Sequence, residues 1–360
     1  MYRRAFLASA TSLLAVPFLP GRARAAFAPE PGEWRRFEVT TELQLPGDAP
    51  TDLWVPLPFA EGEGWNRGGD LRFDGTADHV AQKSDAESGA RYLHAHWNAG
   101  GLPRQLTVTA TVETRDRAVD LGAPRDIAPL DAAERARLTA PSRLVPTDGI
   151  VRETALAITE GTGSDLEAAR AIYDWVVENT ARNPETRGCG LGDVATMLET
   201  GDLTGKCADL NTLYVGLARA AGLPARDVYG LRVAPSRFGY KSLGAGSEIV
   251  TKAQHCRAEV WLSQFGWVPV DPADVRKVML EEVEGGLALD TPKVEAARET
   301  LFGAWEGNWI AYNSAHDLDL PGAGADPVDF LMYPEAEIGG VRQDALSPDS
   351  FAYTIAAREL

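Results

Sequence analysis

The chain has 360 residues, of which 52 are aspartate or glutamate and 35 are lysine or arginine, giving a formal net charge of −17. Such an acidic chain is repelled by nucleic acids and by anionic membrane surfaces, because both are bound mainly through basic side chains. We therefore expect no nucleic-acid partner. The length is sufficient for two domains, each with its own hydrophobic core.

Residues 1–25 have the features of a removable export signal. Arg3 and Arg4 precede an apolar run that continues to Pro20, and small residues suited to signal cleavage end at Ala25. Paired arginines are typical of twin-arginine signals, which export folded proteins. A membrane anchor is the alternative, but the run is short and interrupted by proline. We predict a protein of the periplasm or the extracellular space, without membrane insertion after signal removal.

Residues 26–125 are predicted to form an all-β, sandwich-like domain. Two long segments, 34–43 and 106–113, are rich in β-branched and aromatic residues and alternate between apolar and polar positions. Two shorter segments of this kind, 53–58 and 92–97, lie between them and are separated by turns rich in glycine, proline and aspartate.

The segment 92–97 contains His94 and His96, which share one face of the predicted strand because side chains two residues apart point the same way. Metal ligands can use this spacing. No acidic or cysteine partner is nearby in the sequence, so we favour a pair of surface histidines. A metallohydrolase that uses His94, His96 and the cysteines is the alternative.

Residues 126–149 are predicted to be a linker, and the second domain is expected to run from residue 150 to the C-terminus. Near its start, the sequence Ser-Asp-Leu-Glu at 164–167 is a capping box that opens a helix. The segment 183–190 is then predicted to be a loop, and its position just before Cys207 indicates that it borders the functional cleft.

A helix with a start at Thr204 and Gly205 is predicted next, and its first turn holds the candidate nucleophile. Apolar residues recur at helical spacing from Leu210 to Ala221, and Gly222 and Pro224 end the pattern. Cys207 therefore lies where the helix dipole and free backbone N–H groups favour a thiolate over a thiol. The alternative is a buried, inert cysteine.

The segment 254–262 predicts a half-buried strand in which apolar residues alternate with more polar ones, among them His255. A turn at Gly266 leads into a second short strand that ends at Asp271, within reach of the His255 ring. Cysteine, histidine and a carboxylate placed in this way form a nucleophile, a base and an orienting group.

At this point the chain resembles the transglutaminase-like superfamily, in the segments GKCADL, RAAGLPAR, HCRAEVWL and GWVPVDPAD, over about residues 151–278. The resemblance implies an α+β fold with a papain-like core, in which a nucleophile helix packs on an antiparallel sheet. It also implies that Cys207 is the nucleophile, His255 the general base and Asp271 the orienting carboxylate. The family usually has an aromatic residue two positions after the histidine, where this chain has Arg257, and this leaves the substrate's shape open.

The resemblance further implies cysteine-dependent acyl transfer on peptide or side-chain amides, through a thioester and without a cofactor. Backbone N–H groups at the helix start, including that of Cys207, are the expected oxyanion donors. Water as acceptor would make the protein a protease or amidase, which we favour for an exported enzyme. An amine acceptor would make it a protein-glutamine transglutaminase that forms crosslinks. A non-catalytic binding or scaffold protein on the same fold is the remaining alternative.

Beyond Asp271, the aromatic segment 302–313 is predicted to be core, and the strand-like segments that follow are predicted to extend the second domain. We also predict a disulfide between Cys189 and Cys256. Three cysteines in an oxidising compartment leave one unpaired, and the nucleophile Cys207 has to stay reduced. Two buried free thiols are the alternative.

Overall fold

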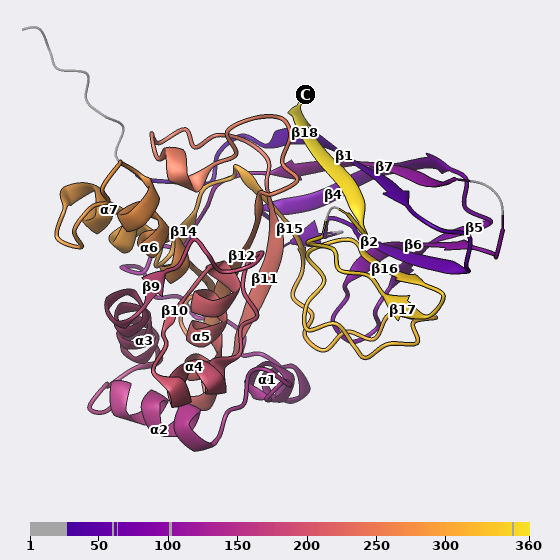
Figure 1. The fold of residues 1–360 in the computed structure, drawn as a ribbon. Helices are drawn as coiled ribbons and strands as arrows, with labels where there is room; N and C mark the ends of the chain where they lie inside the picture. Colours follow the sequence, from indigo (N-terminus) through magenta and orange to yellow (C-terminus); the bar gives the residue numbers. More distant parts are fainter. Residues whose placement is uncertain (1–26, 60, 63, 101–102, 348) are drawn as a thin grey trace, which may run out of the picture.

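The computed structural model describes residues 27–360 apart from residues 60, 63, 101–102 and 348 (Figure 1). The predicted export signal lies outside the described residues. Within the described part of the chain, no helix combines the length and the apolar character that crossing a membrane requires. A β-sandwich forms one side of the molecule, and a mixed layer of helices and strands forms the other.

The β-sandwich consists, within the described residues, of two five-stranded sheets with the strand orders β18-β1-β7-β4-β3 and β17-β16-β2-β6-β5. All neighbouring strands in both sheets are antiparallel. The strands are β1 (Arg35–Leu45), β2 (Thr51–Pro56), β3 (Glu61–Gly62), β4 (Asn66–Gly75), β5 (His79–Ser84), β6 (Arg91–Trp97), β7 (Arg104–Thr114), β16 (Glu335–Ile338), β17 (Val341–Arg342) and β18 (Ala352–Glu359).

The C-terminal strands differ from the sequence prediction, which placed them as an extension of the second domain. β18 pairs with β1 in a register that sets Ile355 opposite Thr41, and β16 pairs with β2 in a register that sets Ala336 opposite Leu53. Both sheets are therefore completed by the end of the chain. Strand partners this far apart in sequence leave no local signal, because pairing depends on which edge is open in the folded molecule.

The second region is built on an antiparallel sheet of the order β13-β12-β11-β15, with α5 packed against β11 and β12 (Figure 1). This arrangement confirms the predicted α+β fold with a β-rich N-terminal part. Its strands are β8 (Arg117–Ala118), β9 (Ala181–Arg182), β10 (Thr204–Gly205), β11 (Ala225–Arg232), β12 (Gln254–Leu262), β13 (Gly266–Val270), β14 (Ala304–Trp305) and β15 (Trp309–Asn313). Its helices are α1 (Ala132–Thr139), α2 (Gly149–Ile158), α3 (Asp165–Asn179), α4 (Val194–Thr200), α5 (Cys207–Ala220), the 3-10 helix η1 (Lys241–Leu243), α6 (Pro272–Glu281) and α7 (Pro292–Thr300).

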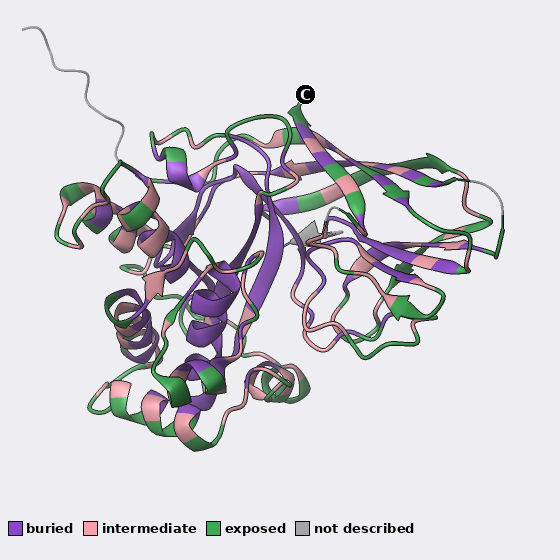
Figure 2. Ribbon diagram, viewed as in Figure 1, coloured by how far each residue is buried: buried purple, intermediate pink, exposed green. Residues whose placement is uncertain are grey.

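The helix α5 is buried along its whole length, whereas α2 keeps an exposed face (Figure 2). The sequence predicted a single apolar stripe on α5, but the sheet covers one side while α2, α3 and α6 cover others. β12 is likewise buried on both faces, apart from Trp261, rather than half-buried as predicted. The residues around the candidate nucleophile are therefore held from every side.

Strand β1 joins the two regions, because its two halves pack into different cores. Phe37 and Val39 pack against Leu231 of β11 and other residues of the second region. Further along the strand, Leu43 and Leu45 pack inside the sandwich. The sandwich and the sheet of the second region are thus fixed relative to each other by one continuous strand.

Candidate active site

The first residue of α5 is Cys207, and its side chain is only 4% exposed. The turn that leads into the helix is held by Asp209, whose carboxylate accepts hydrogen bonds from the backbone N–H groups of Lys206, Leu191 and Gly192 at 2.9–3.0 Å. A Cβ atom at Gly190 would lie 1.9 Å from this carboxylate. Glycine there lets the loop before the helix pass directly over Asp209 and reach the thiol.

The candidate base and its carboxylate lie on neighbouring elements, as the sequence predicted. His255 is buried on β12, and Asp271 caps the N-terminus of α6, where it accepts a hydrogen bond from the Asp274 N–H. The His255 Nε2 atom lies 2.7 Å from the Asp271 Oδ2 atom. This bond leaves Nδ1 as the ring nitrogen available to the thiol. The His255 ring also lies close enough to Cys207 for its charge to lower the pKa of the thiol.

The electrostatics of the three cysteines single out Cys207 as the thiolate. Hydrogen bonds from the Cys189 and Cys256 thiols hold the pKa of Cys207 well below its usual range, and His255 adds a further hydrogen bond and its charge; burial opposes this shift. The hydrogen bond to Cys207 and burial raise the pKa of Cys189, while burial and the same kind of hydrogen bond raise that of Cys256. The two flanking thiols therefore stay protonated as donors.

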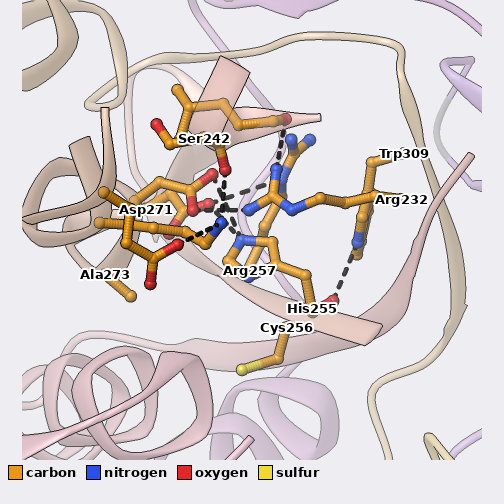
Figure 3. Close-up of polar contacts among 12 residues, drawn as sticks. Arg232, Ser242, His255, Cys256, Arg257, Asp271, Ala273 and Trp309 are labelled. Atoms are coloured by element: carbon orange, nitrogen blue, oxygen red, sulfur yellow. Dashed lines mark hydrogen bonds and ion pairs between the residues drawn. The ribbon is translucent and has the colours of Figure 1, made fainter. Parts of the chain in front are cut away.

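The predicted disulfide between Cys189 and Cys256 is not present, because all three cysteines are free and buried. Cys256 points away from the polar network around His255, as expected (Figure 3). That face of β12 is covered by α5, so the Cys256 thiol meets the start of the helix. The Cys189 thiol donates to the Gln254 carbonyl oxygen at 3.4 Å instead of bonding to Cys256.

A second carboxylate, which the sequence analysis missed, lies beside His255. The Asp274 Oδ2 atom is 3.5 Å from the His255 Nε2 atom, and the Asp274 Oδ1 atom is 2.6 Å from the Arg232 guanidinium. Burial and Arg232 lower the pKa of His255, but Asp274 and Asp271 outweigh them, so this pKa is raised. Burial raises the pKa of Asp274, yet Arg232 and His255 bring it well below its usual range. Asp274 thus stays ionised and favours a protonated imidazole.

Asn211 links the nucleophile helix to the carboxylate and was also missed. It lies four residues after Cys207, which is about one turn along α5. Its Nδ2 atom donates to the Asp271 Oδ1 atom at 3.0 Å and to the Cys256 carbonyl at 2.8 Å, and its Oδ1 atom accepts from the Ala273 N–H at 3.1 Å. An asparagine side chain one turn after the cysteine was the available signal.

Arg257, which replaces the aromatic residue usual in the resembled family, packs between two tryptophan rings and the Asp271 carboxylate. Its guanidinium carbon is 4.7 Å from the ring centroid of Trp309 and 5.3 Å from that of Trp305, and its Nε atom is 3.5 Å from the Asp271 Oδ2 atom. Burial lowers the pKa of Arg257 to about 10. Arg257 is not among the described residues that line the cleft.

One group of potential metal ligands lies in the candidate active site. Donor atoms of His255, Asp271 and Asp274 lie within 4.8 Å of one another, but the guanidinium groups of Arg232 and Arg257 already supply the positive charge at this site. We therefore assign no metal to it.

The histidine pair of the sandwich has an acidic partner that the sequence did not reveal. His94 Nε2 and His96 Nδ1 both lie within 2.9 Å of the same Asp52 oxygen, across the β2–β6 pairing. The cysteines of the metallohydrolase alternative belong to a separate cluster. The pair is thus bridged by a carboxylate rather than directed toward the cysteines.

Cys207 and His255 lie at a cleft of about 1110 Å³ between the two regions of the molecule. The opposite wall is formed by the sandwich, through residues of β1, β7 and the C-terminal strand β18. Arg187, Gly188 and Cys189 also line the cleft, which confirms that the 183–190 loop borders it.

Among the described residues, the cleft contains hydrogen-bond donors that have no partner. None of the described residues accepts a hydrogen bond from the Cys207 N–H, which is at the free N-terminal end of α5. The Gln254 side chain lines the cleft, and its Nε2 atom is buried without a hydrogen bond. An oxygen atom that develops negative charge next to Cys207 would meet donors rather than acceptors.

Comparisons with known proteins identify the family and a relative of this chain. Residues 152–272 match the family model of the transglutaminase-like superfamily. An uncharacterized protein of Haemophilus influenzae is 38% identical over 343 residues, covering 90% of this chain and 91% of that one.

One solved structure extends the likeness to the fold, and a second is given for comparison. The crystal structure of a candidate cysteine protease from Cytophaga hutchinsonii is 18% identical with a TM-score of 0.51, and the match covers 91% of this chain and 99% of that one. The periplasmic domain of TgpA from Pseudomonas aeruginosa is 14% identical with a TM-score of 0.36, covering 69% of this chain and 93% of that one.

Proposed function

This chain belongs to the transglutaminase-like superfamily, and on that premise we propose that it is a cysteine-dependent hydrolase of peptide or side-chain amides. In this proposal Cys207 is the nucleophile, His255 the general base and Asp271 the orienting carboxylate. The observation that carries it is the 2.7 Å bond between His255 and Asp271, next to a thiol with a depressed pKa at a helix start. Side chains arranged in this way activate a nucleophile in many unrelated enzymes.

The reaction begins from the ion pair in which the Cys207 proton is on the His255 Nδ1 atom. The thiolate then attacks the amide carbonyl carbon, and the Cys207 N–H stabilises the resulting oxyanion. When the intermediate collapses, the C–N bond breaks and His255 returns its proton to the leaving amine. Asp271 accepts the Nε2–H bond throughout, which fixes the tautomer and stabilises the imidazolium.

The thioester left on Cys207 is released by a second acceptor. His255 removes a proton from water as the water oxygen attacks, and the thiol returns when the C–S bond breaks. We favour water because the cleft is large and continuous with solvent. A crosslinking transglutaminase would use a primary amine in the same step, so product analysis with an added amine decides between the two acceptors.

The thiol itself provides a test that needs no substrate. The native protein should react with a thiol reagent at neutral pH through Cys207, because the other two thiols have raised pKa values. Peptide libraries treated with wild type or with Cys207→Ala should then differ in their cleaved products. Equal labelling of all three cysteines, together with identical products from the two proteins, would refute the proposed function.

We also propose that the protein is exported by the twin-arginine route, on the basis of Arg3 and Arg4. Replacing both arginines with lysine should leave uncleaved precursor in the cytoplasm of a bacterial host that has this pathway. Full recovery of mature protein in the periplasm would contradict the proposal.

A further inference from the structure

The cleft has the opposite charge to the chain as a whole. Six of its lining residues are lysine or arginine and two are glutamate, whereas the whole chain has 52 acidic and 35 basic residues. Such a local reversal concentrates anions in a concave site with low-dielectric walls. The basic lining residues are Arg182, Arg187, Lys206, Arg232, Lys252 and Lys277.

Four of these six cations are already paired with acidic side chains. Arg232 is paired with the buried Asp274, while Arg182 and Lys277 both contact Glu281. The fourth, Arg187, contacts Asp344 at 2.5 Å, and both of these side chains are largely exposed. These pairs reduce the positive charge that a ligand would meet.

Lys206 and Lys252 are the two cations that remain. Among the described residues, neither has an acidic group within ion-pair distance. Lys206 directly precedes Cys207, and Lys252 lies three residues before His255, a span of at most about 11 Å of extended chain. Both lysines line the same cleft as the two candidate reacting residues.

One unpartnered polar group of the lining, the Gln254 side-chain amide, has the same preference. Gln254 lies between Lys252 and His255 in the chain, is nine-tenths buried, and has an Nε2 donor without an acceptor. A buried donor without a partner is unfavourable until a ligand supplies an acceptor. Free cations and a free amide donor together are suited to carboxylate oxygens.

We propose that the amide substrate carries a carboxylate within about two residues of the reacting bond, and that Lys206 and Lys252 bind it. This inference rests on the proposed function and adds the substrate class. In a peptide the carboxylate is either an aspartate or glutamate side chain or the C-terminal group. A nucleic acid would instead face the strongly negative surface of the chain outside the cleft.

The first test compares two alkylating reagents at Cys207, the anionic iodoacetate and the neutral iodoacetamide. The ratio of their rates at Cys207, divided by the same ratio for a small model thiol, measures local attraction for a carboxylate. The state of the thiolate cancels in this ratio because both reagents react with the same sulfur. We expect a normalised ratio above one that falls as the salt concentration rises.

Charge removal then identifies the residues responsible. Lys206→Gln and Lys252→Gln should each lower the normalised ratio by about two- to fivefold, and the double variant should lower it further. The matched control is Lys83→Gln, because Lys83 is exposed on β5 and does not line the cleft. A ratio of one in wild type, or equal ratios in wild type and the double variant, would overturn the inference.

The second test measures turnover of matched peptides. One pair differs by glutamate against glutamine beside the scissile amide, and another by a free against an amidated C-terminus. Preference for glutamate assigns the carboxylate to a side chain, and preference for the free acid assigns it to the terminus. Turnover that is equal for all four peptides would refute the anionic substrate and leave the proposed function standing. Equal turnover by Cys207→Ala would refute the proposed function itself.

Discussion

Two ion pairs of equal length, one in each β region of the molecule, lie in opposite environments. On the sandwich sheet that contains β1, Arg67 and Glu113 pair at 2.6 Å, with side chains that are 48% and 32% exposed. Beside the sheet of the second region, Arg232 and Asp274 pair at the same distance, but their side chains are only 5% and 2% exposed. The geometry is alike, and the difference lies in the solvent that surrounds each pair.

This difference changes what each pair does. An exposed pair contributes about 0–1 kcal/mol, because water screens the charges and fixing two long side chains costs entropy. A buried pair has to offset the cost of removing both charges from water, so stability alone seldom favours it over apolar residues. Arg232 and Asp274 contact each other and, through Asp274, the His255 ring. We interpret the buried pair as part of the electrostatics of the candidate site.

The largest expected effect is a loss of activity from substitutions in the second region, which contains Cys207 and His255. Cys207→Ala and His255→Ala should each lower kcat by roughly 10⁴-fold or more, and the double variant should be no worse than either one, because the two residues act as a unit. Steady-state kinetics on a cleaved peptide, with the three variants side by side, measures this. Multiplicative losses in the double variant, or full activity in Cys207→Ser, would mean that the two residues do not form a catalytic pair.

The next largest expected effect tests the orienting role of the Asp271 carboxylate. Asp271→Asn should keep the fold, because asparagine also caps helices well and can still accept from the Asp274 N–H. The amide that replaces Oδ2 cannot accept the Nε2–H bond, so the imidazole takes the wrong tautomer, and kcat should fall by about 10²–10⁴-fold. Thermal melting and kinetics on the same sample test this. A loss of less than tenfold would assign the orienting role to Asp274 instead.

Part of the site could be predicted because its geometry is local. The apolar periodicity that ends at Gly222 and Pro224 placed Cys207 in the first turn of a helix, and a tight hairpin placed Asp271 beside His255. Strand and helix periods fix such relations over about twenty residues. The order of these elements was therefore visible before any tertiary contact was known.

The remaining part depends on contacts that no local pattern encodes. Arg232 ends β11, and Asp274 lies more than forty residues further on, so only the fold brings their charges together. The pairing of β18 with β1 and the meeting of Cys189 with Cys207 arise in the same way. Alternation in β12 also failed to reveal that both of its faces are covered, since covering layers come from other parts of the chain.

A stability experiment sharpens the comparison between the ion pairs. Asp274→Asn should leave the buried Arg232 without an anion and lower the free energy of unfolding by about 3–5 kcal/mol. The double variant Arg232→Met with Asp274→Leu should recover most of that loss while activity stays low, because apolar residues can replace a buried pair but not its charge. Urea denaturation and kinetics give the two values. Activity that recovers together with stability would show that the pair has only a structural role.

The pH dependence of alkylation tests how the thiolate is stabilised. The Cys189 thiol and His255 both lower the pKa of Cys207 in the structure. The midpoint of the rate of Cys207 alkylation against pH should therefore move upward in Cys189→Ala and in His255→Ala. Cys256 serves as an internal reference, because burial raises its pKa and it should stay unreactive near neutral pH. Unchanged midpoints in both variants would leave the helix start as the main cause of the low pKa.

The smallest expected effect comes from breaking the exposed pair of Arg67 and Glu113. Glu113→Gln removes the partner of Arg67, but the guanidinium keeps its hydration and its position 4.0 Å from the ring centroid of Trp34. The free energy of unfolding should therefore fall by no more than about 1 kcal/mol, and by less at high salt, since counterions already screen the pair. Urea denaturation at low and high salt measures this against Asp274→Asn under identical conditions. A loss as large as that of Asp274→Asn would mean that solvent exposure does not separate the two kinds of pair. A small, salt-dependent loss would attribute the contrast to burial, because the two pairs have the same separation and differ in their exposure to water.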